Sequence, residues 1–278
     1  MRRARELARR RPLTAALTLV AFYFAVFFVP PLFSDQSFGR GKAISGAIDL
    51  TAQLPLEVVL ALSVLGAVWL FGWWRECRFT TTLRPGGLKF LVFPYLFAGL
   101  LLLLVALAVK SEAGVELRDA VSPSLVGSLI TVTLLIGVFE ETLFRGVLFH
   151  GIEANHGMTA ALIGSSVAFG LMHYVNWVGG QPFAITSGQV AHAVAAGFMY
   201  AALMLRIGSI WPVILFHGFW NATVALIGTL GAQLPGAADA SQTASVLVAA
   251  GLLGFELAYG LLVLWSVRRM RPRILPSG

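Results

Sequence analysis

The sequence predicts an all-α, polytopic membrane helix bundle, because of its apolar composition, its long apolar segments and its uneven distribution of basic residues. Of the 278 residues, 58% are hydrophobic and only 12% are charged, and the mean hydropathy is +0.82. An ordinary soluble domain has about 45–50% apolar and about 25% charged residues. The excess of apolar side chains needs lipid as its solvent, which excludes a soluble enzyme, a disordered chain and a secreted disulfide scaffold.

Eight segments are long and apolar enough to cross a bilayer, which takes roughly 20 residues of helix. The first is expected to be a retained helix, because no small-residue cleavage site of a signal peptide follows it. No internal repeat and no long linker divides the chain, so residues 1–278 are expected to form a single integral-membrane domain. In chain order the predicted helices are 13–33, 56–74, 88–109, 125–150, 158–176, 189–205, 211–230 and 243–267.

Basic residues gather at one set of helix ends, which the positive-inside rule assigns to the cytoplasm. The opposite ends carry only Arg40, Lys42, Lys110 and Arg118. Both termini are therefore expected in the cytoplasm, which requires an even number of crossings and agrees with eight. The basic residues assigned to the cytoplasmic side are Arg2, Arg3, Arg5, Arg9, Arg10, Arg11, Arg75, Arg78, Arg84, Lys89, Arg145, Arg206, Arg268, Arg269, Arg271 and Arg273.

The net charge of +7 and the pI of about 10.2 indicate an anionic partner. Because the basic residues lie at predicted membrane edges, anionic lipid is the expected partner and nucleic acid is not. A composition rich in arginine, alanine and leucine is typical of a GC-rich prokaryotic genome. The expected location is therefore a prokaryotic plasma membrane. The single cysteine, Cys77, can form neither an internal disulfide nor a thiolate metal cluster. The sequence gives no indication of an oligomeric state.

Ionisable residues inside the predicted helices are the candidates for function, because a charge within a bilayer is costly and is usually retained for a purpose. Asn221 is a neutral companion to them. These candidates are Glu140, Glu141, Arg145, His173, His192, His217 and Glu256.

Two adjacent glutamates lie midway along the fourth predicted helix. Glu141 and Arg145 are four residues apart and share a helix face, so they are expected to pair. Glu140 points about 100° away from its neighbour, so it is expected to stay unpaired and free to act as a general base. In the alternative interpretation, both glutamates only pair with basic groups and hold the bundle together.

The histidines allow two interpretations each. His217 and Asn221 are four residues apart and face the same way. They could donate hydrogen bonds to a developing oxyanion, or they could form an interhelical hydrogen-bond clamp. His173 alone is more typical of a packed, hydrogen-bonded residue than of a catalyst. Glu256 is expected to bond a neighbouring helix, and His192 is expected to be structural as well.

Three motifs link these residues to a known family. Residues 140–145 read EETLFR and match EExxxR, residues 169–173 read FGLMH and match FxxxH, and residues 217–221 read HGFWN and match HxxxN. Residues 208–212, which read GSIWP, are similar to the family's lead-in to the last motif. The chain therefore resembles the CAAX protease and bacteriocin-processing (CPBP) family of intramembrane endopeptidases, over a motif-bearing core of about 125–230.

The resemblance implies an all-helical membrane protease with a buried site. The first-motif glutamate corresponds to Glu140 and the FxxxH histidine to His173, which would together position and deprotonate the attacking water. His217 and Asn221 would stabilise the tetrahedral oxyanion. Glu141 and Arg145 would brace the site.

The family has been described both as metal-dependent and as a glutamate protease without metal. The chain has no His-Glu-x-x-His helix, the usual arrangement of zinc proteases. Glu140, His173 and His217 could still supply a three-ligand zinc site. Water activation without a metal or other cofactor is the favoured interpretation, and the metalloprotease interpretation stays open.

The depths of these residues are a difficulty for a shared site. At 1.5 Å per residue, Glu140 should lie about 15 Å from the cytoplasmic end of its helix, His217 about 9 Å and His173 about 22 Å. The site closes only if the fifth helix is tilted, begins later or borders a cavity.

The sequence thus predicts an intramembrane endopeptidase of CAAX-processing type that hydrolyses a peptide bond of a membrane-associated or lipidated peptide. The alternative is a non-catalytic immunity or scaffold protein that binds peptides with the same polar network. A small transporter is a third hypothesis, because buried glutamate and histidine also form proton relays, but transporters often have repeats and this chain shows none.

Overall fold

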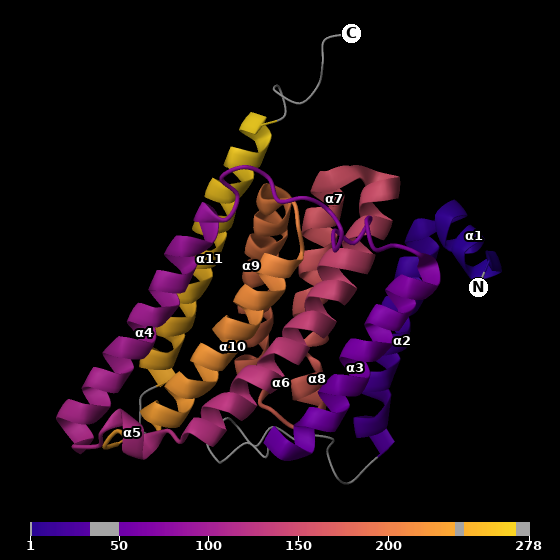
Figure 1. Cartoon of the computed structure of the whole chain (residues 1–278). Coiled ribbons are helices and arrows are strands. Elements are labelled where there is room, and N and C mark those ends of the chain that lie inside the picture. Colours follow the sequence, from indigo (N-terminus) through magenta and orange to yellow (C-terminus); the bar gives the residue numbers. More distant parts are fainter. Residues whose placement is uncertain (1, 34–49, 237–241, 271–278) are drawn as a thin grey trace.

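The protein is a helical bundle in the computed structural model, which describes residues 2–33, 50–236 and 242–270 (Figure 1). No strand occurs among these residues, which confirms the predicted all-α class. The helices are α1 (Arg2–Arg10), α2 (Pro12–Phe33), α3 (Leu50–Phe71), α4 (Lys89–Ala113), α5 (Leu117–Ala120), α6 (Pro123–Glu141), the π-helix η1 (Thr142–Leu148), α7 (Phe149–Met172), α8 (Val175–Val178), α9 (Phe183–Ile207), α10 (Trp211–Gly231) and α11 (Gln242–Met270).

Seven helical stretches of the described chain are long and apolar enough to cross a membrane. One of them, Pro123–Val178, has 56 residues and would be about 84 Å long if straight, against a hydrocarbon core of about 30 Å. It reverses direction at Gly157, where φ is 80° and ψ is 172°, and Figure 1 shows α7 folded back on itself there. Glycine adopts this backbone without steric cost. Counted as two crossings, this stretch brings the total to the eight that the sequence predicts.

The reversal corrects one predicted boundary. The sequence predicts that the fourth helix ends at His150 and that the fifth begins at Met158. In the structure α6, η1 and the first part of α7 continue as one helical run to Gly157. Packing explains only the first added turn, since Phe149 and Gly151 are buried and the backbone of a buried segment must satisfy its own hydrogen bonds. Residues 154–156 are exposed, and the run ends beyond them at Gly157.

α1 and the last turn of α11 lie at the same end of the bundle (Figure 1). This agrees with an even number of crossings. That end also holds Arg206 and the connection between α3 and α4, with Arg75, Arg78 and Arg84, and we refer to it as the arginine-rich end. Its location in the cytoplasm stays a prediction, as does the single domain over residues 1–278.

The connection between α3 and α4 packs tightly against the turn between α9 and α10. The backbone N–H of Arg84 donates to the carbonyl of Ile207 at 2.7 Å, and the Thr81 hydroxyl donates to the carbonyl of Gly208 at 2.6 Å. Cys77 is fully buried beneath it, and burial, with a smaller contribution from Glu76, raises the pKa of its thiol. The connection between α3 and α4 therefore covers the turn between α9 and α10, and its buried cysteine is poorly reactive.

Candidate active site

The motif residues lie on α6, η1, the C-terminal end of α7 and α10, which meet inside the bundle. Glu140 and Glu141 end α6, and Arg145 follows in η1. All seven residues of η1 are buried. A π-helix is rare and frequently marks a functional site, because its wider turn displaces the side chains that follow it. Here it occurs directly after the two glutamates of the first motif.

The hairpin at Gly157 brings Glu140 and His173 to the same depth. Glu140 is 17 residues before Gly157 and His173 is 16 residues after it. Because the two arms are antiparallel, nearly equal numbers of residues place both side chains at the same level. The expected difference in depth does not arise, since the helical run continues past His150.

A buried network joins the first and last motifs. An amine of the Arg145 guanidinium donates to Oε1 of Glu141 at 3.0 Å, as the sequence predicts, and both side chains are fully buried. The same oxygen lies 2.8 Å from Nδ1 of His217. A carboxylate only accepts hydrogen bonds, so this Nδ1 carries the proton. The Arg145 guanidinium also lies over the Phe169 ring, 4.1 Å from its centroid.

Glu140 is not isolated, which corrects the expectation from the sequence. Its Oε2 lies 3.4 Å from Nε2 of His217, so the imidazole lies between the two adjacent carboxylates. The helix geometry separates the glutamates by about 100°, and a side chain on another helix can still contact both. The Glu140 side chain keeps 15% of its surface exposed, whereas Glu141 has none.

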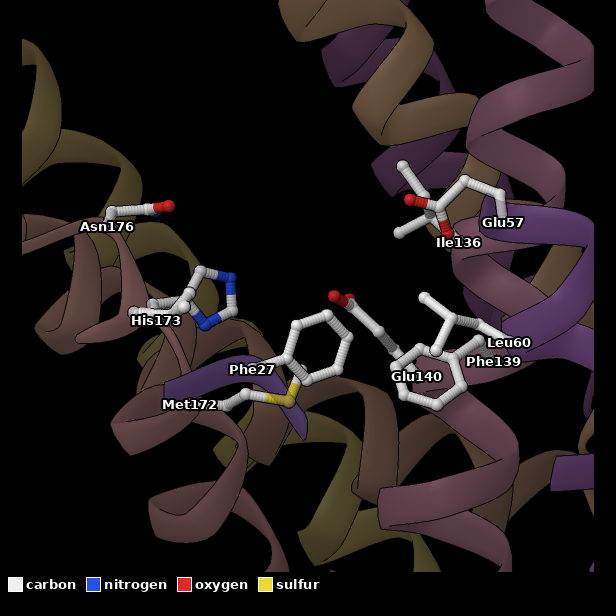
Figure 2. A pocket seen from close by; sticks show the side chains of 10 residues that line it. Phe27, Glu57, Leu60, Ile136, Phe139, Glu140, Met172, His173 and Asn176 are labelled. Atoms are coloured by element: carbon white, nitrogen blue, oxygen red, sulfur yellow. The ribbon is translucent and has the colours of Figure 1, made fainter. Parts of the chain in front are cut away.

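His173 faces Glu140 across a cavity of about 190 Å³ (Figure 2). Its Nδ1 lies 3.0 Å from the backbone carbonyl of Phe169. Because a carbonyl accepts, Nδ1 carries the hydrogen and Nε2 is the nitrogen left for other partners. Most of the cavity wall is apolar, formed by Phe27, Leu60, Ile136, Phe139, Met172 and Val175.

A second cavity of about 430 Å³ brings the whole set together. Glu140, His173, His217 and Asn221 all line it, and Glu140 and His173 line the smaller cavity as well. The two catalytic groups expected for water activation therefore border both spaces. The two expected oxyanion donors border the larger one.

His192 and Glu256 form a pair between α9 and α11. Nε2 of His192 lies 3.1 Å from Oε1 of Glu256, whose side chain is 1% exposed. The His192 ring stacks on Trp220 with centroids 6.5 Å apart. The interhelical partner expected for Glu256 is thus His192, which also lines the larger cavity.

Glu57 was missed by the sequence analysis. It lines the smaller cavity together with Glu140 and His173. The predicted helix began at residue 56, which put Glu57 at a membrane edge, where a charge is unremarkable. α3 begins at Leu50, so Glu57 lies two turns inside the helix. A predicted helix that began several residues earlier in the sequence would have included Glu57 among the ionisable residues inside the membrane.

The alternative zinc ligands do not form a metal site in this arrangement. Among the described residues, no three His, Cys, Asp or Glu side chains are grouped so that they could hold a metal ion. His217 directs one ring nitrogen at Glu141 and the other at Glu140, and His173 has committed Nδ1 to a backbone carbonyl.

Comparisons with known proteins give one match. Neither a search of curated proteins nor a search of solved structures found a match to the chain. Residues 122–223 match the family model described as type II CAAX prenyl endopeptidase Rce1-like, a protease family. The matched segment contains all three motifs, and these carry the side chains around the two cavities. The resemblance predicted from the motifs is thereby confirmed, and this segment of the multi-pass membrane protein is similar to the Rce1-like CAAX endopeptidases.

Proposed function

We propose that the protein is an intramembrane endopeptidase in which Glu140 and His173 activate a water molecule. One observation carries the proposal: the four side chains Glu140, His173, His217 and Asn221 line a single cavity. They come from three helices that are distant in sequence, and they supply a base, a second water-binding group and two hydrogen-bond donors. That is the set which peptide hydrolysis by water requires.

The reaction begins with a water molecule held between Glu140 and His173. Glu140 takes a proton from the water as the oxygen attacks the peptide carbonyl. The carbonyl oxygen becomes a tetrahedral oxyanion, which accepts hydrogen bonds from the Asn221 amide and from Nε2–H of His217, whose imidazole carries a hydrogen on both ring nitrogens in this step. Glu140 then returns the proton to the departing amine, so the peptide bond breaks and the base is restored.

Glu141 and Arg145 act as positioning residues in this mechanism. Glu141 holds Nδ1 of His217 at 2.8 Å, which fixes the ring so that Nε2 is directed toward Glu140 and the cavity. Arg145 balances the buried charge of Glu141 at 3.0 Å. Neither residue lines the cavities, so their effect on the reaction passes through His217.

The substrate proposed is a membrane-associated or lipidated peptide. The mostly apolar wall of the smaller cavity suits the hydrocarbon part of a peptide side chain, and a chain with this many membrane helices meets its substrates at lipid. The proposed location is a prokaryotic plasma membrane.

The test is cleavage of a prenylated CAAX reporter peptide, and of the same peptide without its lipid, by the purified protein in nanodiscs. Glu140→Gln should lower the rate by about 10²–10⁴-fold, the usual contribution of a general base, and a strong chelator should not. Glu112→Gln is the matched control, because Glu112 is exposed and lies outside both cavities.

Three results would change the conclusion. Unchanged turnover by Glu140→Gln would remove Glu140 as the base. Activity lost to chelation and restored by zinc would require a different arrangement in which Glu140, His173 and His217 bind the metal. Binding of peptides without cleavage of any would favour the non-catalytic scaffold.

A further inference from the structure

A second carboxylate, beside that of Glu140, faces the smaller cavity. Glu57 on α3 and Glu140 on α6 both direct their carboxylates into it, and His173 lies on the other side (Figure 2). Glu57 is half-buried, and it has no ion-pair partner in the part of the chain that the structure describes. Nothing in the proposed mechanism uses it.

The other buried acids differ from Glu57 in this respect. Glu141 is paired with Arg145 and His217, and Glu256 with His192. Glu140 shares the imidazole of His217. A carboxylate that is partly removed from water and unpaired raises the free energy of the protein unless a partner supplies the opposite charge. Glu57 has no such partner among the described residues, so a ligand in the cavity can supply the opposite charge.

The composition of the cavity walls indicates the charge of that partner. Among the described residues that line either cavity, none is lysine or arginine. A ligand that carries a carboxylate therefore meets Glu57 and Glu140 without a strong countercharge. A ligand that carries a cation meets two carboxylates in a partly apolar space, where their attraction is stronger than in water.

The smaller cavity has room for one side chain of a substrate. Its volume is about 190 Å³, several times the roughly 30 Å³ that one water molecule occupies in the liquid. Its apolar lining, which includes Phe27 and Leu60, suits the hydrocarbon stem of a long basic residue. Glu57 is placed to pair with the cationic head of such a residue.

We propose that Glu57 is a specificity-determining residue that selects peptides with a lysine or arginine next to the scissile bond. The inference rests on the proposed function, because it requires the scissile bond to lie beside Glu140. It divides the tasks in the cavity between two carboxylates. Glu57 binds the cationic side chain of the substrate, and Glu140 activates the water.

The test compares internally quenched, membrane-associated peptides that differ only in having lysine, norleucine or glutamate at each position around the scissile bond. The wild type should prefer lysine at one position, with a kcat/KM at least about tenfold higher than for norleucine. Glu57→Gln should abolish that preference by raising KM for the lysine peptide while kcat changes less than about threefold.

Two further variants separate specificity from a structural role. Glu57→Asp keeps the charge and should retain the preference for lysine, whereas Glu57→Lys should prefer the glutamate peptide. Glu112→Gln, an exposed carboxylate outside the cavities, should behave as the wild type. Equal kcat/KM for the three peptides in the wild type, or an unchanged lysine preference in Glu57→Gln, would overturn the inference.

A binding measurement distinguishes failure of this inference from failure of the proposed function. Glu140→Gln should bind the fluorescent lysine peptide at least about tenfold more tightly than the glutamate peptide, and adding Glu57→Gln should remove the difference. That result, without cleavage of any peptide by the wild type, would support Glu57 and contradict the peptidase. Equal binding of both peptides by Glu140→Gln would contradict the role of Glu57 whether or not cleavage occurs.

Discussion

α9 passes through two regions that differ in packing. From residue 195 to its end at Ile207, nearly every side chain is buried, whereas from Phe183 to residue 194 only Thr186, Val190 and Ala193 are. The first stretch belongs to a packed half with η1 and the connection between α3 and α4. The second belongs to a hollow half, where it lines the larger cavity with Gln189, His192 and Ala193; Ala196 and Tyr200 of the packed stretch line the same cavity. The network divides along the same line: Glu141 and Arg145 are sealed in the packed half, while Glu140 and His173 border the cavities.

This difference shows how the first motif, residues 140–145, can contribute both to the packing of the bundle and to the candidate active site. The packed half holds a charged pair that would be costly to bury unless its geometry were fixed. The hollow half keeps its polar groups accessible to water and peptide. His217 connects the halves, because its two ring nitrogens face Glu141 and Glu140. Stability and activity should therefore respond to different substitutions.

The sharpest contrast expected is in labelling by a membrane-impermeant maleimide. Arg268→Cys lies at the arginine-rich end, and Glu112→Cys lies at the end of α4 on the opposite side. If the basic end is cytoplasmic, intact cells should label Glu112→Cys and not Arg268→Cys, and inside-out vesicles should give the reverse. The buried Cys77 should not react in either preparation.

Asn176→Cys extends that experiment to the hollow half, because Asn176 lines the smaller cavity. Like Glu112→Cys, it should be labelled in intact cells and not in inside-out vesicles. That result would mean that the cavities open away from the cytoplasm. Labelling of Asn176→Cys only in inside-out vesicles would contradict this assignment.

Removing the buried cation should have the largest effect on stability. Arg145→Met leaves Glu141 buried without its partner, and breaking such a pair typically costs about 3–5 kcal/mol. The free energy of unfolding in detergent should fall by that amount. Arg10→Met is the control, since the Arg10–Glu6 pair is exposed and should contribute little. A stable Arg145→Met protein would show that the packed half does not depend on the pair.

Loss of an oxyanion donor should reduce activity in the hollow half without unfolding it. Asn221→Ala should lower kcat by about 10²–10³-fold, the usual effect of removing one such donor. The midpoint of thermal unfolding should stay close to that of the wild type, because Asn221 is only partly buried. A change in KM alone would assign Asn221 to substrate binding.

Two glycines on α9 give the smallest effect and compare the halves directly. A Cβ at Gly197 would lie 2.7 Å from a guanidinium nitrogen of Arg145, whereas at Gly188 it would meet nothing within 4 Å. Gly197→Ala should therefore destabilise the protein by about 1–3 kcal/mol through overpacking. Gly188→Ala should be neutral or slightly stabilising, because alanine favours a helix. Equal effects would mean that the two halves of α9 are packed alike.

Much of this arrangement could be predicted from the sequence, because hydropathy and helix periodicity act locally. Composition predicted the helical bundle, and the spacing of Glu141 and Arg145 predicted their ion pair. The sequence placed a connection at residues 151–157, which contains the turn at Gly157, but it did not predict that the helix continues up to that glycine. The position of His217 between two glutamates, and of Glu57 opposite His173, depends on contacts between distant helices, which no local pattern encodes.

The most direct test of the account compares the adjacent glutamates, measuring kcat and the free energy of unfolding for Glu140→Gln and Glu141→Gln side by side. Glu140→Gln should lose about 10²–10⁴-fold in kcat and keep the stability of the wild type. Glu141→Gln should be destabilised, since it leaves Arg145 buried without its counter-ion. An active Glu140→Gln protein, or equal losses of activity and stability in both variants, would contradict the separation of a packed half that supports from a hollow half that reacts.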